Sequence, residues 1–235
     1  MTNQNLLLLS SSRVGDTPYL SHALDMIKDH LGEVTELLFI PYAGITINYD
    51  KYTQMVQTAL NDKNIKVVGI HSHADPVNAV KNAKAIAVGG GNTFRLLHQL
   101  YENKLIGAIQ DRVSHGMPYI GWSAGSNVAG ATIRTTNDMP IIEPPSFNAL
   151  KLVNFQINPH YTDYTPPGHN GETREQRLQE FMVLNPTTEI VGIVEGTALK
   201  MTGETITLIG GKAGYLFLGG KKTEIEDGYE LTAIN

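Results

Sequence analysis

The chain has 235 residues, of which 41% are hydrophobic and 17% charged, enough to bury the core of one large domain spanning residues 1–235. A net charge of −5 and a pI near 5.9 give no basic surplus for binding nucleic acid or an anionic membrane. The absence of cysteine excludes a disulfide framework, thiol catalysis and cysteine-based zinc sites. The apolar run Leu6–Leu9 is far too short to cross a membrane, and we expect it to form a buried strand.

The first half of the chain alternates short apolar runs with amphipathic stretches. Because the runs are continuous in Val, Ile and Leu, they predict strands that are covered on both faces. The predicted strands are Asn5–Ser10, Glu36–Pro41, Lys66–His71, Ala85–Gly89 and Pro118–Trp122, and the predicted helices are Leu20–Leu31, Tyr49–Asp62, Pro76–Ala83 and Thr93–His115. This alternation predicts an α/β fold, a three-layer α/β/α sandwich around a mostly parallel central sheet.

The second half has a different pattern. A polar, proline-rich stretch over Ala131–Ala149 predicts a long loop, and a short strand follows at Asn154–Asn158. Within Gly168–Asn185 we predict a helix opened by Thr173, because Gln176 three residues further on completes a capping box. Glycines separate the last strand-like runs, which predict antiparallel hairpins that extend the sheet near the C-terminus: Ile190–Val194, Ala198–Met201, Thr205–Ile209 and Tyr215–Leu218.

The most informative motif is Gly-Trp-Ser-Ala-Gly at 121–125, which directly follows a predicted strand. A sharp turn at the end of a buried strand can hold a serine hydroxyl upward, and flanking glycines let strand and helix approach closely. A serine hydroxyl is a weak nucleophile and needs a neighbouring base. The pattern alone leaves two interpretations open, a nucleophile at Ser123 or a serine in an ordinary turn.

A second glycine-rich turn, Gly-Gly-Gly-Asn-Thr at 89–93, follows another predicted strand. It lacks the Gly-Lys-Ser/Thr that a phosphate-binding loop requires. If the two strand ends are adjacent, the amides of Gly91 and Ala124 would face one oxygen and form an oxyanion hole. The alternative is a tight strand-to-helix turn without a ligand.

Eight histidines are candidates for the base, and His160 stands out because it follows the predicted strand Asn154–Asn158. His71 and His73 form a His-x-His pair with Asp75 nearby, which superficially suggests a metal site. A useful metal site needs further ligands, and this segment has no obvious second cluster, so we expect no metal there.

Two acids are candidates for orienting the base. Asp138 lies in the predicted loop, and Glu195 follows the apolar run Ile190–Val194 and precedes a glycine. A carboxylate at such a strand end is costly unless it has a partner. The alternative for Glu195 is a strand-end glutamate that faces water.

Several motifs, in order along nearly the whole chain, resemble the peptidase E family of bacterial alpha-aspartyl dipeptidases, which is related to the cyanophycinases. They are Phe-Ile-Pro-Tyr-Ala-Gly (39–44), Gly-Gly-Gly-Asn-Thr-Phe (89–94), Gly-Trp-Ser-Ala-Gly (121–125), Ile-Arg-Thr-Thr-Asn-Asp-Met-Pro (133–140), Ile-Asn-Pro-His (157–160) and Gly-Glu-Thr-Arg-Glu-Gln-Arg (171–177). Beyond about Gly203 the match is loose, and no functional residue is expected there.

The resemblance implies a fold like that of class I glutamine amidotransferases, a cytoplasmic location and cleavage of dipeptides with an N-terminal aspartate. It maps the nucleophile to Ser123, the base to His160 and the oxyanion amides to Gly91 and Ala124. It maps the third catalytic residue to Glu195 or to Asp138. We favour Glu195, because a strand end holds a carboxylate more firmly than a long loop does.

Arg174 falls in the first turn of the predicted helix, where a guanidinium and the helix amides together suit a small carboxylate. The residues alone favour the alternative, a surface arginine paired with Glu175 or Glu180. The resemblance favours binding of the aspartate side chain.

We therefore predict a serine peptidase that acts on Asp-X dipeptides without a metal or organic cofactor. Its expected partner is the peptide, rather than nucleic acid or a membrane, and the sequence leaves monomer and homodimer open. A cyanophycinase-like peptidase for beta-aspartyl dipeptides is one alternative, and a non-catalytic module that binds an acidic ligand is another. An α/β-hydrolase esterase is disfavoured, because its base normally lies near the C-terminus.

Overall fold

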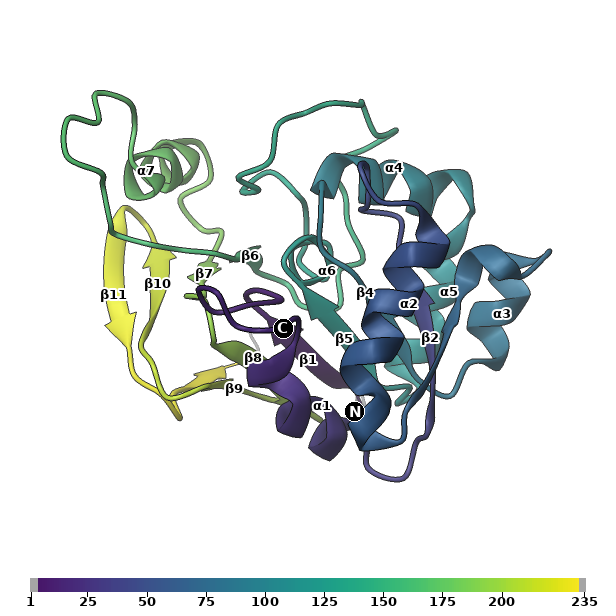
Figure 1. Ribbon diagram of the computed structural model, residues 1–235. Coiled ribbons are helices and arrows are strands. Elements are labelled where there is room, and N and C mark those ends of the chain that lie inside the picture. Colours follow the sequence, from purple (N-terminus) through teal and green to yellow (C-terminus); the bar gives the residue numbers. More distant parts are fainter. Residues whose placement is uncertain (1–3, 233–235) are drawn as a thin grey trace.

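A sheet of eight strands forms the centre of the computed structural model, which describes residues 4–232 (Figure 1). The strand order is β12–β9–β8–β1–β5–β4–β2–β3. The strands are β1 (Asn5–Leu9), β2 (Glu36–Ile40), β3 (Lys66–Gly69), β4 (Ile86–Val88), β5 (Tyr119–Trp122), β8 (Ala198–Thr202), β9 (Thr205–Ile209) and β12 (Glu230–Thr232). Strands β1 to β5 pair in parallel, whereas β8, β9 and β12 continue the sheet by antiparallel pairing.

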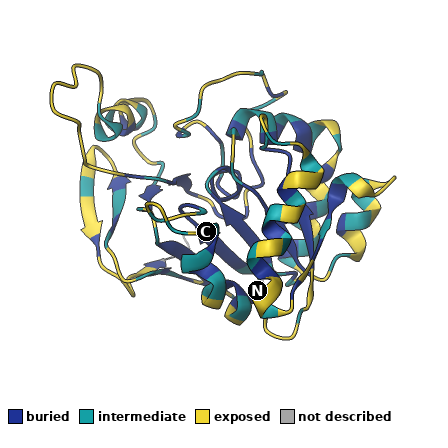
Figure 2. Cartoon of the chain, viewed as in Figure 1, coloured by how far each residue is buried: buried dark blue, intermediate teal, exposed yellow. Residues whose placement is uncertain are grey.

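Helices cover both faces of this sheet, because successive residues of a strand point to opposite sides. Leu6 and Leu8 of β1 face one core, together with residues of α3 (Pro76–Asn82), α4 (Thr93–Glu102) and α5 (Leu105–Ser114). Leu7 and Leu9 face another core, with residues of α1 (Leu24–Leu31) and α2 (Tyr49–Leu60). Figure 2 shows the strands buried between these layers. The predicted α/β fold is confirmed.

A second sheet of four strands lies beside the first, in the order β11–β10–β7–β6. Its strands are β6 (Gln156–Asn158), β7 (Ile190–Gly192), β10 (Gly214–Leu218) and β11 (Lys221–Ile225). The prediction that Ile190–Val194 and Tyr215–Leu218 extend the central sheet is therefore wrong. These strands have a core of their own, in which Ile190 and Phe217 pack against α7 (Arg174–Leu184).

The single helix predicted over Thr93–His115 is also wrong, because the structure divides it into α4 and α5. Lys104 between them has the left-handed backbone φ of 56°. Leu100 and Leu105, on either side of the break, lie in the same core. The apolar pattern is therefore continuous across the break and does not reveal it.

The helix predicted after Thr173 is confirmed as α7, since Thr173 and Gln176 form the expected capping box. The polar stretch Ala131–Ala149 is irregular, apart from an isolated bridge between Thr132 and Asn148. Among residues 4–232, no helix combines the length and apolar character needed to cross a membrane.

Acid should destabilise the fold through His30 of α1, which is only 5% exposed. Burial, followed by the charge of Lys200, lowers the pKa of His30 from 6.5 to about 4. The unfolded chain therefore takes up this proton first, and stability present above pH 6.5 is lost as the pH falls towards 4, by roughly 3 kcal/mol. In His30→Leu, the free energy of unfolding, measured by urea denaturation, should change less between pH 6.5 and 4 than it does in the wild type. His115→Gln, at an exposed position, is the control, and an unchanged slope in His30→Leu would contradict this account.

Candidate active site

Turns from both sheets meet at the carboxyl ends of parallel strands. Ser10 follows β1, the turn 89–92 follows β4, and Ser123 follows β5, whose strand lies between the other two. His160 and Glu195 follow β6 and β7, which are parallel neighbours in the second sheet. Carboxyl ends of neighbouring parallel strands are where open α/β sheets bind ligands.

Ser123 occupies a tight, strained turn between β5 and the short helix α6 (Ala124–Asn127). Its backbone φ is +53°, an uncommon value for a residue other than glycine. A Cβ on Gly125 would collide with the carbonyl of Val88, and a Cβ on Gly121 would collide with the backbone of Gly125. Both glycines of the motif are therefore required for strand and helix to approach this closely.

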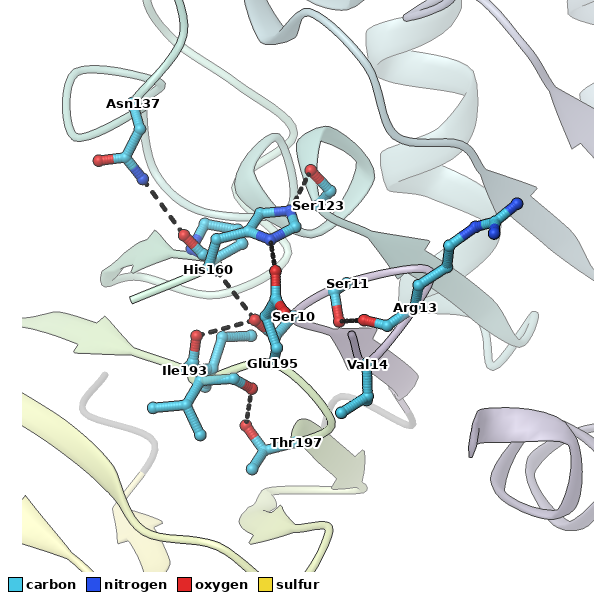
Figure 3. Close-up of polar contacts among 12 residues, drawn as sticks. Ser10, Ser11, Arg13, Val14, Ser123, Asn137, His160, Ile193, Glu195 and Thr197 are labelled. Atoms are coloured by element: carbon cyan, nitrogen blue, oxygen red, sulfur yellow. Dashed lines mark hydrogen bonds and ion pairs between the residues drawn. The ribbon is translucent and has the colours of Figure 1, made fainter. Parts of the chain in front are cut away.

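His160 connects Ser123 to Glu195, as Figure 3 shows. Its Nε2 lies 2.9 Å from Ser123 Oγ, and its Nδ1 lies 2.9 Å from Glu195 Oε1. A carboxylate at Nδ1 favours the tautomer with the proton there, which leaves Nε2 free to accept the serine proton. The side chains of His160 and Glu195 are 36% and 49% exposed, so solvent reaches this chain of contacts.

Ser10 holds the turns that carry His160 and Glu195. Its Oγ accepts the His160 N–H at 2.9 Å and donates to the Ile193 carbonyl at 2.8 Å (Figure 3). The Ser10 N–H donates to the Thr197 carbonyl at 2.9 Å. Sequence reasoning missed this residue. The available signal was a serine directly after the unbroken apolar run Leu6–Leu9, at the carboxyl end of a buried strand.

The two glycine-rich turns lie against each other. A Cβ on Gly90 would come within 3.0 Å of Ser123 Cβ, and the backbone φ of Gly91 is +135°. Tyr52 donates from its hydroxyl to the Gly90 carbonyl at 2.9 Å and so supports this turn. Within residues 4–232, neither Gly91 nor Ala124 donates its backbone N–H to a protein acceptor. Two free amides therefore lie next to the serine.

Asp138 lies near the site but does not hydrogen-bond to His160. Its Oδ2 accepts the backbone N–H of Thr93 at the start of α4, at 2.7 Å. The loop around it is tied to the end of β6, because Asn137 Nδ2 donates to the Pro159 carbonyl at 3.2 Å. Of the two predicted acids, Glu195 is the one in contact with the histidine.

A cavity of about 210 Å³ brings Arg174 and Asp138 together with Ser123 and His160. Arg174 Nη1 is buried and has no hydrogen-bond partner. Burial, followed by the charge of Arg177, lowers the pKa of Arg174. A buried N–H group without an acceptor is unfavourable, so this half-buried side chain is suited to bind a carboxylate that enters the cavity.

The alternative of a surface pair between Arg174 and Glu175 does not match the structure, because Glu175 pairs with Lys222 at 3.0 Å. Lys222 lies on β11, beyond the point where any functional residue was expected.

A second cavity, of about 370 Å³, shares Ser123 and His160 with the first, and Gly91 lies in its wall. Its lining is mostly apolar and aromatic and includes Tyr19, Ile45, Ile47, Tyr52 and Met55. Ser123 and His160 therefore line both a charged cavity and a more apolar one.

Two residues of the suggested metal site, His71 and Asp75, have local structural roles instead. His71 Nε2 lies 2.9 Å from Asp50 Oδ1, and Asp75 caps α3 by accepting the Asn78 N–H at 2.9 Å. Within the described part of the chain, no three His, Asp or Glu side chains are grouped so that they could hold a metal ion.

A serine, a histidine and a carboxylate in hydrogen-bonded series, with free amides beside the serine, define the site of a serine hydrolase. Residues 6–209 match the protein-family model that is described as Peptidase family S51. A Peptidase E from Shewanella amazonensis is 55% identical over 233 residues, which cover 99% of this chain and 99% of the relative. A Peptidase E from Shewanella baltica is 59% identical over 215 residues, which cover 92% of this chain and 91% of the relative.

The chain therefore belongs to peptidase family S51, and the predicted class of serine dipeptidase is confirmed. Two solved structures share the fold. A peptidase from an acI-B1 Actinobacterium has a TM-score of 0.73 at 17% identity and covers 99% of this chain and 98% of its own. A putative peptidase E protein from Listeria monocytogenes EGD-e has a TM-score of 0.65 at 23% identity and covers 87% of this chain and 97% of its own.

Ser10→Ala should misplace the base. The substitution leaves the His160 N–H without a partner, whereas the Ile193 carbonyl loses one donor and keeps the Tyr161 N–H at 3.0 Å. We therefore expect the free energy of unfolding to fall by about 1–3 kcal/mol. Small displacements of a catalytic group are costly, so we expect kcat to fall by on the order of tenfold or more. Denaturation and steady-state kinetics measure the two effects.

Ser11→Ala is the matched control, because Ser11 Oγ donates only to the nearby Arg13 carbonyl. If Ser10→Ala and Ser11→Ala have the same kcat as the wild type, Ser10 does not position the histidine.

Proposed function

We propose that this chain hydrolyses dipeptides whose N-terminal residue is aspartate, with Ser123 as the nucleophile. The assignment of aspartate as the N-terminal residue rests on one observation. Arg174 lines the cavity beside Ser123 and His160, and its buried Nη1 has no hydrogen-bond partner. A short acidic side chain entering this cavity would supply the missing acceptor and remove the cost of the unpaired cation.

Asp138 gives the substrate's free ammonium group a place in the same cavity. One carboxylate oxygen of Asp138 is bound to the Thr93 N–H, and the group lies in the wall beside Ser123. An ammonium near Asp138 and a carboxylate near Arg174 would orient the aspartyl residue at both ends. The cavity measures about 210 Å³, a size that suits a single aspartyl residue.

Catalysis then proceeds by general-base attack. His160 Nε2 takes the proton from Ser123 Oγ, and the oxygen attacks the carbonyl carbon of the aspartyl residue. The N–H groups of Gly91 and Ala124 bind the oxyanion that forms. His160 returns the proton to the leaving amine as the C–N bond breaks. Water, deprotonated by His160, hydrolyses the resulting ester and releases aspartate.

The leaving residue occupies the apolar cavity of about 370 Å³ that Ser123 also lines. Its lining by Tyr19, Ile47 and Met55 favours aliphatic and aromatic side chains over charged ones. We further propose a cytoplasmic location, on the resemblance to the peptidase E family.

Hydrolysis of a panel of peptides by wild type, Ser123→Ala and Arg174→Met tests the proposal. Wild type should cleave Asp-Leu faster than Asn-Leu and should not cleave N-acetyl-Asp-Leu, which lacks the ammonium group. Ser123→Ala should lose turnover while its circular dichroism spectrum is retained. Arg174→Met should lose most of the preference for Asp-Leu over Asn-Leu.

Turnover of Asp-Leu by Ser123→Ala at the wild-type rate would refute the mechanism. A wild-type enzyme that cleaves Asn-Leu as fast as Asp-Leu would refute the substrate assignment while leaving the nucleophile in place. Methionine approximates the length of arginine, so packing around α7 is disturbed little.

Two amide substitutions distinguish the acids. Glu195→Gln removes the charge that orients His160, so kcat for Asp-Leu should fall by about 100-fold or more, with KM little changed. Asp138→Asn should act mainly on binding and raise KM, because it removes the partner proposed for the ammonium group. A severe loss of kcat in Asp138→Asn alone would instead make Asp138 the third catalytic residue.

A further inference from the structure

Lys222 of β11 forms the centre of a charged cluster next to the proposed active site. Its Nζ lies 2.6 Å from Asp163 Oδ1 and 3.0 Å from Glu175 Oε2. The same ammonium lies 4.5 Å from the ring centre of Tyr215 and 5.4 Å from that of Tyr161. The Lys222 side chain is only 19% exposed. Two carboxylates and two aromatic faces thus hold one largely buried cation.

The cluster joins two points of the chain that matter for the proposed reaction. Tyr161 directly follows His160, and Glu175 directly follows Arg174. Between Thr162 and Glu172 the chain is exposed throughout, as the yellow loop in Figure 2 shows. Through its ion pairs with Asp163 and Glu175, Lys222 therefore attaches both ends of this exposed segment to the second sheet.

The first turn of α7 has few other attachments. Leu178 and Met182, the buried residues of this helix, lie one and two turns further along. Thr173 and Gln176 complete the capping box, but these bonds are internal to the helix end. The ion pair between Glu175 and Lys222 is thus the contact that ties the turn carrying Arg174 to β11.

The ion pair also keeps Glu175 on the β11 side of the helix turn. Asp138 and Glu195, by contrast, line cavities together with Arg174. Hydrogen bonding by Tyr161, whose hydroxyl donates to Asp163 at 2.6 Å, fixes the other side of the cluster.

We propose that Lys222 is a positioning residue for substrate selection, which holds the first turn of α7 so that Arg174 presents its guanidinium to the aspartate side chain. Lys222 itself does not touch the substrate. The inference rests on the role proposed above for Arg174. It predicts that removing Lys222 raises KM and reduces the selectivity for aspartate while kcat is retained, because Ser10 positions His160 from β1 rather than from β11.

A double-mutant cycle tests the proposal, with wild type, Lys222→Met, Arg174→Met and the double variant assayed on Asp-Leu and Asn-Leu. Lys222→Met should lower kcat/KM for Asp-Leu by about tenfold, through KM, and leave Asn-Leu nearly unchanged. In the Arg174→Met background, Lys222→Met should have no further effect on the ratio of the two substrates. Lys222→Arg should restore most of the wild-type ratio.

Lys221→Met, at the exposed neighbouring position of β11, is the matched control and should behave like wild type. If Lys222→Met does not fold, Glu175→Gln removes only the link to α7 and should shift the ratio in the same direction. Equal losses of kcat on both substrates, or an undiminished effect in the Arg174→Met background, would overturn the proposal.

The outcome separates this inference from the proposed function. A wild-type enzyme without preference for Asp-Leu over Asn-Leu refutes the function itself. If wild type shows the preference and Arg174→Met loses it, but Lys222→Met keeps it, only the role of Lys222 fails.

Discussion

The geometry of the site depends on how one buried serine joins two sheets. Ser10 directly follows β1 of the central sheet, yet its hydroxyl binds the backbone of two segments of the second sheet. These are the turn after β6, at His160, and the residue after β7, Ile193. The bond to Ile193 is buried and the bond to His160 is partly buried. Within residues 4–232 the His160 N–H has no other acceptor, so losing Ser10 would leave it unpaired at a cost of about 1–3 kcal/mol. This cost fixes the base on the second sheet relative to the nucleophile on the first.

Strain is concentrated at the same place. Ser123 and His160 both have positive backbone φ, at 53° and 54°, which few residues other than glycine adopt. Such conformations persist only when neighbouring groups hold them. Ser123 is held by the closely packed glycines at 121 and 125 and by the buried strand before it. His160 is held by the hydrogen bond from its N–H to Ser10. The apolar core thus offsets the strain of the two residues that must face each other.

The fold and the candidate site were predictable from the sequence to different degrees. Strands covered on both faces were predicted well, because apolar runs such as Leu6–Leu9 report burial directly. The break at Lys104 was missed, since residues on both sides pack into one core. The second sheet was missed for a related reason: an apolar strand shows that it is buried, but not against which partner. Ile190 and Phe217 contact α7 rather than the central helices.

Motifs at strand ends predicted which residues lie at the site, because turns after parallel strands meet at one edge. They could not predict the contacts of Ser10 or Lys222, which connect segments 150 and 47 residues apart in the chain.

The contact of Lys222 with Glu175 matters because the protein as a whole is acidic, with a net charge of −5. Attraction of an acidic substrate cannot come from the overall charge and must be local. Arg174 supplies the local cation in the wall of the cavity beside Ser123. The helix turn that carries it is attached to β11 by the pair of Glu175 and Lys222, so two segments far apart in the chain place this cation.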